Sequence, residues 1–178
     1  MINLFQVPTP DEYASFYADY IQRVQQRGDV IAALPRQIDE LRAALGHLTN
    51  EQALFRNAPK EWSIKEVMGH INDVERVFSY RLLRVSRKDK TPLPGFEQDD
   101  YVRESGFDTV ELNDLIAEFE FLRRANILAI HNMTEEATRQ IGTASGAAVS
   151  ARALIHMLVG HVDHHLASLE EKYLPMLK

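Results

Sequence analysis

The sequence predicts an all-α fold, most simply a four-helix bundle with a long crossover loop. Two observations support this prediction. Several segments repeat apolar side chains at helical spacing behind capping residues, and no segment shows the alternation of a half-buried strand. The chain has 178 residues, of which 45% are hydrophobic, and this suits one domain with a sizeable core. We therefore expect residues 1–178 to form a single helical domain.

Two helices are expected before residue 50. The first starts at Thr9-Pro10-Asp11-Glu12, which offers a cap, a first-turn proline and two acids, and its apolar stripe runs from Tyr13 to Val24. The second covers about Val30–Leu45. Pro35 inside it either kinks the helix or marks a later start near Leu34.

A capping box opens the third expected helix, because Ser63 is followed three residues later by Glu66. This helix continues to about Arg87. The next segment, Asp89–Gly106, holds two prolines, two glycines and many charges, and we interpret it as a long surface loop.

Two further helices are expected in the C-terminal half. One starts between Asp108 and Glu111 and ends near Met133, and the other is capped by Ser150 and runs to about Tyr173. Between them, Gly142–Gly146 is expected to be a flexible turn.

Composition excludes several function classes. The chain has no cysteine, which excludes thiol nucleophiles, iron–sulfur clusters and cysteine-type zinc sites. The net charge of −6 argues against nucleic acid as a partner. No apolar run approaches the roughly 18 residues of a membrane helix, and Met1–Pro10 lacks the features of a signal peptide. We expect a cytoplasmic protein with no membrane partner.

Histidines supply the most informative pattern, since four of the seven fall between His156 and His165. His161 and His165 are four residues apart, about 40° around a helix, so that their rings can meet one metal ion. His164 offers a competing pair with His161, and spacing alone does not choose between them. His156 is about 140° from His161 and is not expected to join either pair.

A third ligand must come from another helix, and His70 is the best candidate because it shares the apolar face of the capped third helix. His47 and His131 are expected on the surface. Val162 stands where the HExxH motif of metalloproteases needs its glutamate, so no general base accompanies the pair. Imidazole ligands suit Zn, Ni, Cu and Fe alike.

Four segments together resemble the DinB-like superfamily, most closely its YfiT-like branch, whose members are described as metal-dependent hydrolases. These segments are Glu61–His70, Asp73–Arg76, Pro92–Phe96 and Gly160–His165. Each motif is weak alone, but they occur in the same order, and the similarity extends from Tyr17 to Tyr173.

The resemblance implies a DinB-like four-helix bundle with three histidine ligands to one divalent metal ion. Matched by position, these ligands are His70, His161 and His165, which settles the choice against His164. Zinc or nickel is favoured, and iron or manganese is possible. The resemblance also implies a homodimer and a small-molecule substrate. Some relatives are transferases that use a low-molecular-weight thiol such as bacillithiol or mycothiol.

Other side chains near these motifs have two interpretations each. Asp73 is a candidate for holding the free ring nitrogen of a ligand, whereas Asp163 is expected to be solvated. Trp62 is expected to pack as a hydrophobic staple rather than as a platform for substrate.

Three arginines, Arg76, Arg81 and Arg84, either meet an anionic ligand or pair with helix acids such as Glu75. The segment Pro92–Asp100 either covers the site or braces the bundle or a dimer partner.

The leading functional hypothesis is a metal-dependent enzyme that performs hydrolase-type chemistry with an activated water. One alternative is a thiol-dependent S-transferase of the bacillithiol or mycothiol kind that uses a metal-bound thiolate. Another is a non-catalytic stress protein that binds a metal or a ligand. The sequence leaves the choice between them open, together with the substrate.

Overall fold

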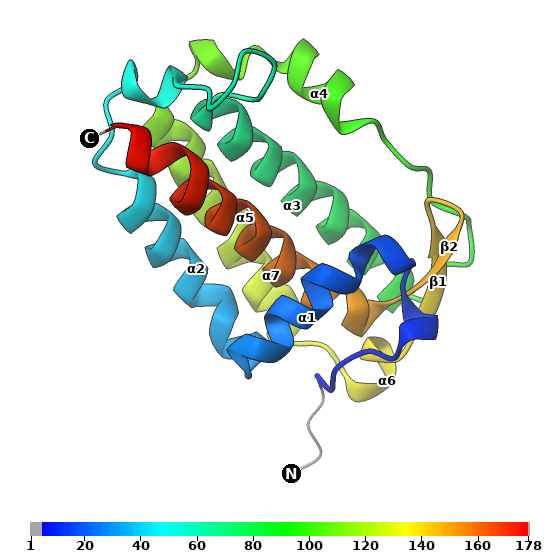
Figure 1. Cartoon of the computed structure of the whole chain (residues 1–178). Helices are drawn as coiled ribbons and strands as arrows, with labels where there is room; N and C mark the ends of the chain where they lie inside the picture. Colours follow the sequence, from blue (N-terminus) through cyan, green and yellow to red (C-terminus); the bar gives the residue numbers. More distant parts are fainter. Residues whose placement is uncertain (1–4, 178) are drawn as a thin grey trace.

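A computed structural model describes residues 5–177 of the chain. Residues 1–4 and 178 lie outside this range. They belong to the expected 1–178 domain, and residues 1–4 also belong to the segment that is expected to lack a signal peptide. Four long helices form the bundle, as predicted: α2 (Val30–Leu45), α3 (Ile64–Ser86), α5 (Leu112–His131) and α7 (Ala151–Ser168). Helix α3 packs against α5 and α7, and α2 packs against the same two helices from the other side (Figure 1). None of the described helices is both long and apolar enough to cross a membrane.

The predicted helix starts are confirmed where a side chain caps them. Ser63 and Glu66 form both hydrogen bonds of the capping box at the start of α3. Ser150 accepts a hydrogen bond from the backbone of Ala153 at the start of α7. Helix α2 passes through Pro35 as one element and begins behind an Asp29 cap, so the later start near Leu34 is not used.

The first helix starts later than predicted. Two 3-10 turns, Pro10–Glu12 and Ser15–Tyr17, precede helix α1 (Ala18–Arg27). Tyr13 lies in an extended conformation between the two turns, which interrupts the apolar stripe that the sequence shows there. The Glu12 side chain bonds to Thr9 and to Arg152 of α7, and these contacts hold the first turn apart from α1.

A long crossover joins α3 to α5, but it is not only loop as predicted. It contains helix α4 (Gln98–Ser105), which ends at Gly106 in a left-handed conformation that suits glycine. The crossover takes the chain back along the bundle, so that α5 begins at the same end as α3 (Figure 1). There the hydroxyl of Ser63 donates a hydrogen bond of 2.5 Å to Asp108.

The sequence prediction of no strands is wrong for one short hairpin. After a one-turn helix α6 (Glu135–Thr138), strands β1 (Ile141–Ala144) and β2 (Ala147–Ser150) pair antiparallel. Both residues of the connecting turn, Ser145 and Gly146, have positive φ, as a two-residue type I′ turn requires. Leu93 of the crossover pairs with this hairpin through two backbone hydrogen bonds. Its N–H donates to the Thr143 carbonyl, and its carbonyl accepts from the Ser145 N–H.

The apolar core consists of two clusters along the bundle axis, with polar side chains between them. On α3, one cluster ends at Ile71 and the other begins at Val74. On α7, the division falls between Val159 and Val162. His161 lies at this division, so the histidines are part of a buried polar layer between the two clusters.

Candidate metal centre

Helix α7 presents His161 and His165 on one face, as their spacing predicts. His161 is 4% exposed and His165 is partly buried. Gly160 lets α1 approach this part of α7, because a Cβ added there would lie 2.6 Å from the Cβ of Tyr20. The close contact of α1 with α7 therefore covers one side of the histidine pair.

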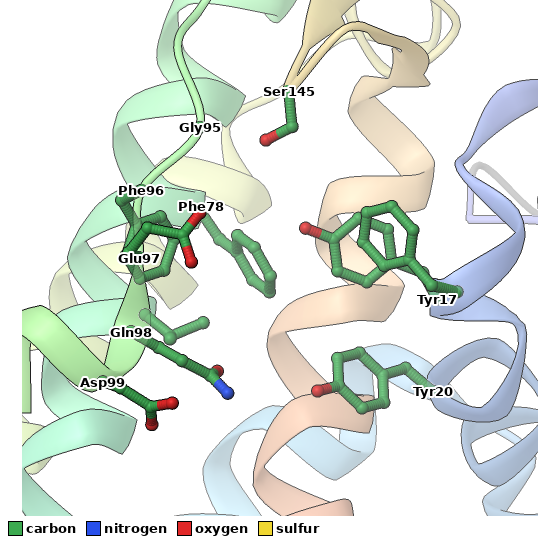
Figure 2. A pocket seen from close by; sticks show the side chains of 11 residues that line it. Tyr17, Tyr20, Phe78, Gly95, Phe96, Glu97, Gln98, Asp99 and Ser145 are labelled. Carbon is green, nitrogen blue, oxygen red and sulfur yellow. The ribbon is translucent and has the colours of Figure 1, made fainter.

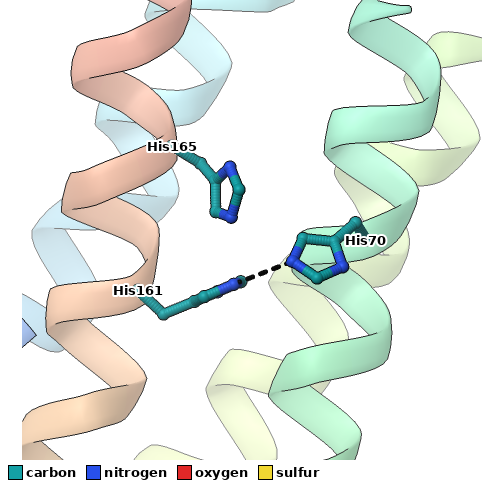
Figure 3. Close-up of side chains that lie close together, drawn as sticks. All are labelled: His70, His161 and His165. Atoms are coloured by element: carbon teal, nitrogen blue, oxygen red, sulfur yellow. Dashed lines mark hydrogen bonds between the residues drawn. The ribbon is translucent and has the colours of Figure 1, made fainter. Parts of the chain in front are cut away.

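Helix α3 brings His70 to the same point from the opposite side of the core. His70 is 2% exposed, and its Nε2 lies 3.1 Å from Nε2 of His161, so one ring donates a hydrogen bond to the other. The ring centroid of His165 lies 4.9 Å from that of His70 and 4.5 Å from that of His161. One nitrogen from each of the three rings lies within 4.8 Å of the others (Figure 3).

Burial keeps these three rings uncharged. It lowers the pKa of His70 to about 4, with a smaller contribution from the charge of His164. Burial also lowers the pKa values of His161 and His165 well below that of an ordinary histidine, and the neighbouring rings add to the effect. Neutral imidazole is the form that ligates metals, so the folded chain presents three rings ready to bind one.

The remaining histidines lie outside this cluster. The ring of His164 is 3.4 Å from the Asp19 carboxylate on α1, and its side chain is 43% exposed. His156 is buried, and its Nδ1 lies 2.9 Å from the carbonyl oxygen of Arg152. His47 and His131 are exposed, as predicted.

Aromatic side chains surround the cluster. Trp62 packs on His70 with ring centroids 4.7 Å apart, so it touches the site as well as the start of α3, where a staple was expected. Tyr20 and Phe78 meet His161 edge-on at 5.6 and 6.0 Å. Burial raises the pKa of Tyr20 to about 12, so that its phenol remains a hydrogen-bond donor at neutral pH.

The two acids singled out in the sequence do not hold the histidine rings. Asp163 was expected to be solvated, but it accepts hydrogen bonds of 2.7 Å from both Arg27 and Gln37. Asp73 lies 3.8 Å from Arg76 and makes no hydrogen bond to His70 in the described structure. Burial raises the pKa of the Asp73 carboxyl.

Two of the three arginines pair with acids. Arg76 pairs with Glu118 of α5, and Arg84 pairs with Asp89. Arg81 is buried, and its guanidinium donates to two neutral groups, the carbonyl of Pro94 and the hydroxyl of Ser145. Glu75, the acid expected to serve such arginines, is bound by none of them.

Two cavities open beside the histidines and share residues at the start of α4. One, of about 590 Å³, lies between α1, the crossover and the hairpin turn, and Tyr17, Tyr20 and Phe78 are among its walls (Figure 2). The other, of about 360 Å³, includes Trp62 and His165 in its lining. Gln98 and Asp99 line both. The Pro92–Asp100 segment therefore lines both cavities, and the hydrogen bond from Arg81 to the Pro94 carbonyl ties it to α3.

The sequence patterns did not identify the residues that line these cavities. Tyr17 and Tyr20 were assigned only to an apolar helix stripe, although both hydroxyls point into the larger cavity (Figure 2). A tyrosine pair at three-residue spacing within such a stripe was the available signal. Gln98 and Asp99 carried no signal, because their position depends on where the crossover returns along the bundle.

A sequence profile of the DinB superfamily matches residues 33–169. The chain belongs to the DinB superfamily. This confirms the family that the motifs predict. No curated protein sequence matches the chain.

Among the solved structures that resemble this DinB-superfamily fold are the two described next. One is "YfiT from Bacillus subtilis", described as a probable metal-dependent hydrolase with an unusual four-helix bundle topology. It has a TM-score of 0.77 and 16% identity, over 95% of this chain and 93% of that one. The other is the mycothiol-dependent maleylpyruvate isomerase, with a TM-score of 0.65 and 14% identity. That match covers 79% of this chain and 59% of the isomerase, so this chain spans little more than half of it. At such identities the similarity shows the fold.

The donor set of this DinB-superfamily chain fits a divalent cation. Two nitrogens that bind one ion at about 2.1 Å lie about 3.0–3.4 Å apart for bond angles of about 90–110°. The 3.1 Å separation between His70 and His161 falls in that range. Three neutral nitrogens without a carboxylate suit zinc, nickel or iron better than magnesium or calcium. The cluster therefore suggests a divalent metal ion.

Proposed function

We propose that His70, His161 and His165 bind one divalent metal ion and that the protein is a metal-dependent enzyme with hydrolase-type chemistry. The observation that carries the proposal is the convergence of three uncharged imidazoles, two buried and one partly buried, beside a cavity. A divalent ion with three neutral ligands keeps its full charge and open positions, and it lowers the pKa of a water or thiol that binds it. Zinc and nickel are the first candidates, followed by iron and manganese.

The chain's own residues give this centre a defined environment. Trp62, Tyr20 and Phe78 place apolar ring surface against the histidines, which excludes bulk water and strengthens electrostatic interactions at the site. Asp99 is the acid that lines both cavities. We assign it the role of accepting a proton from a nucleophile that enters from either side.

Thiol-dependent transfer is the second candidate, and the paired cavities favour it. A transferase must bind two molecules beside one centre, and here two cavities meet at Gln98 and Asp99. The similarity to a mycothiol-dependent isomerase agrees with this reading of the fold. The homodimer and the cytoplasmic location that the sequence suggests remain predictions, as does the single domain.

Metal content measured by mass spectrometry tests the assignment. Untagged protein is expected to hold one divalent ion per chain, and Ala at His70, His161 or His165 is expected to remove most of it, since two remaining imidazoles bind weakly. The matched controls are His47→Ala and His131→Ala, which change exposed histidines and should keep the metal. Full occupancy in His70→Ala would overturn the assignment.

Cobalt-substituted protein separates the enzyme from a non-catalytic metal protein. An added thiol should change the visible spectrum if a coordination position is open. An unchanged spectrum, with a fourth protein ligand found in the metal-bound structure, would support a structural site instead. Activity screens with ester or amide substrates, each with and without bacillithiol or mycothiol, then separate hydrolysis from thiol transfer.

A further inference from the structure

Two arginines are buried in the described part of the chain, and only one has an acidic partner. Arg123 is fully buried and forms a two-point ion pair with Glu75, with both N–O distances 2.8 Å. Arg81 is 2% exposed and forms no ion pair with any described residue. Buried charges are normally paired, because the loss of hydration is otherwise uncompensated. Arg81 therefore lacks the kind of partner that Arg123 has.

The neutral partners of Arg81 lead into the larger cavity. Its Nη2 donates to the hydroxyl of Ser145 at 3.0 Å and to the carbonyl of Pro94 at 2.9 Å. Burial raises the pKa of the Tyr17 phenol, whereas the positive charge of Arg81 and a hydrogen bond from it lower this pKa. The guanidinium of Arg81 therefore lies beside the phenol oxygen. Tyr17 and Ser145 both line the cavity, and their oxygens point into it (Figure 2).

The hydrogen bond from Arg81 sets the direction of the Ser145 hydroxyl. A hydroxyl whose oxygen accepts from a guanidinium keeps its hydrogen free for another acceptor. Ser145 is held in place for this role by an unusual backbone: its φ of 52° lies in the left-handed region at the hairpin turn. The Leu93 backbone donates to the Thr143 carbonyl and accepts from the Ser145 N–H, so it holds the start of the turn. The cavity thus ends in the oriented Ser145 hydroxyl and the Tyr17 phenol, beside the buried positive charge of Arg81.

We propose that this end of the cavity binds the carboxylate of a substrate whose apolar body lies against Phe78 and Phe96. A carboxylate accepts from both hydroxyls and supplies the negative charge that Arg81 lacks. Glu97 and Asp99 line the cavity without a basic residue among its walls, so they disfavour a second negative charge on the ligand. The chemical class is therefore a monocarboxylate.

Two walls of the cavity also pack against the histidine cluster. Tyr20 and Phe78 form its wall and also contact the ring of His161. The ligand is called a substrate because of this contact, and in that respect the inference rests on the proposed function. The binding of the carboxylate does not rest on the proposed function, because Tyr17, Ser145 and Arg81 act without a metal.

Nitrogen-15 NMR titration with phenylacetate tests the proposal, with phenylacetamide as the neutral analogue and phenylmalonate as the dianion. Phenylacetate should shift the amide signals of Gly95, Ser145 and Gly146, and it should bind more tightly than either analogue. In the double variant Tyr17→Phe/Ser145→Gly, its Kd should rise about tenfold or more, as expected for the loss of hydrogen bonds to a charged group. Glycine keeps the positive φ of the turn while removing the hydroxyl.

Two controls keep the result interpretable. Tyr80→Phe removes an exposed phenol outside this cavity and should leave the Kd unchanged. His70→Ala should also bind phenylacetate normally, whatever the metal content proves to be, which separates this inference from the proposed function. Equal binding by wild type and double variant, equal binding of phenylacetamide, or no binding of phenylacetate would each overturn the proposal. Binding lost only in His70→Ala would place the carboxylate at the histidines instead and would also overturn it.

Discussion

Individual charged residues fasten the N-terminal segment to the site-bearing helix. Glu12 is buried, and its carboxylate accepts a hydrogen bond of 2.7 Å from Arg152 of α7 and another from the Thr9 hydroxyl. Burial by itself would raise the pKa of Glu12, but the hydrogen bonds from Arg152, Ser150 and Thr9 outweigh it and lower the pKa to about 2. The free energy of unfolding therefore depends on the protonation of this single carboxylate.

The sign of the pH effect follows from the lowered pKa. Glu12 contributes stability above its ordinary pKa of 4.5, and this contribution is lost as pH falls toward about 2. Urea unfolding should show that Glu12→Gln is less stable than wild type at pH 7 and that the difference shrinks between pH 4.5 and 2.5. Glu104→Gln, an exposed control, should show almost no difference at any pH. A gap for Glu12→Gln that stays constant down to pH 2.5 would contradict the assignment.

The helices were the most predictable elements, since their caps are local. Ser63 with Glu66, and Ser150, fix the starts of α3 and α7 through bonds within four residues. The hairpin escaped prediction because its strands are four residues long and rich in glycine and alanine, with no alternating pattern. Helix α4 was missed because its eight residues are mostly polar and bury only Val102.

The candidate site was predictable only in part for a similar reason. The spacing of His161 and His165 is a property of one helix, and His70 follows from the apolar face of another. The partners of Asp163 come from α1 and α2, at positions 27 and 37, so no local pattern reveals them. The family resemblance, rather than spacing, decided between His164 and His165.

The contact between α1 and α7 depends on one glycine. A Cβ at Gly160 would lie 2.6 Å from the Cβ of Tyr20, so Gly160→Ala must push the two helices apart. We expect a loss of about 1–3 kcal/mol in unfolding free energy, as for overpacking elsewhere. Weaker metal retention should accompany it, because His161 is the next residue. Urea denaturation and metal analysis check both effects.

Gly95→Ala is the control for this substitution. A Cβ there would come no closer than 3.4 Å to its nearest neighbour, the Ser145 hydroxyl, so it should change stability little. If Gly160→Ala is as stable as Gly95→Ala, the close approach of α1 does not restrict position 160 to glycine.

Across the whole molecule, a polar layer divides the apolar core. Arg123 donates to Glu75 and, at 2.6 Å, to Gln37, and Gln37 in turn donates to the Val159 backbone and to Asp163. These bonds join all four bundle helices at the level of His161. Each apolar cluster on either side is complete without the histidines. The layer fixes the relative rotation of the helices, and thereby the meeting of the rings from α3 and α7.

The two separate apolar clusters predict that the bundle folds without a bound metal ion. Chelation should lower the melting temperature but leave the helical circular dichroism nearly unchanged, because the two apolar clusters and the Arg123 network remain. If metal only adds binding free energy, a hundredfold excess over its Kd stabilises the fold by about 2.7 kcal/mol. His70→Ala should melt at the same temperature with and without chelator. Loss of helical signal on chelation of the wild type would show that the metal, rather than the apolar core, determines whether this chain folds.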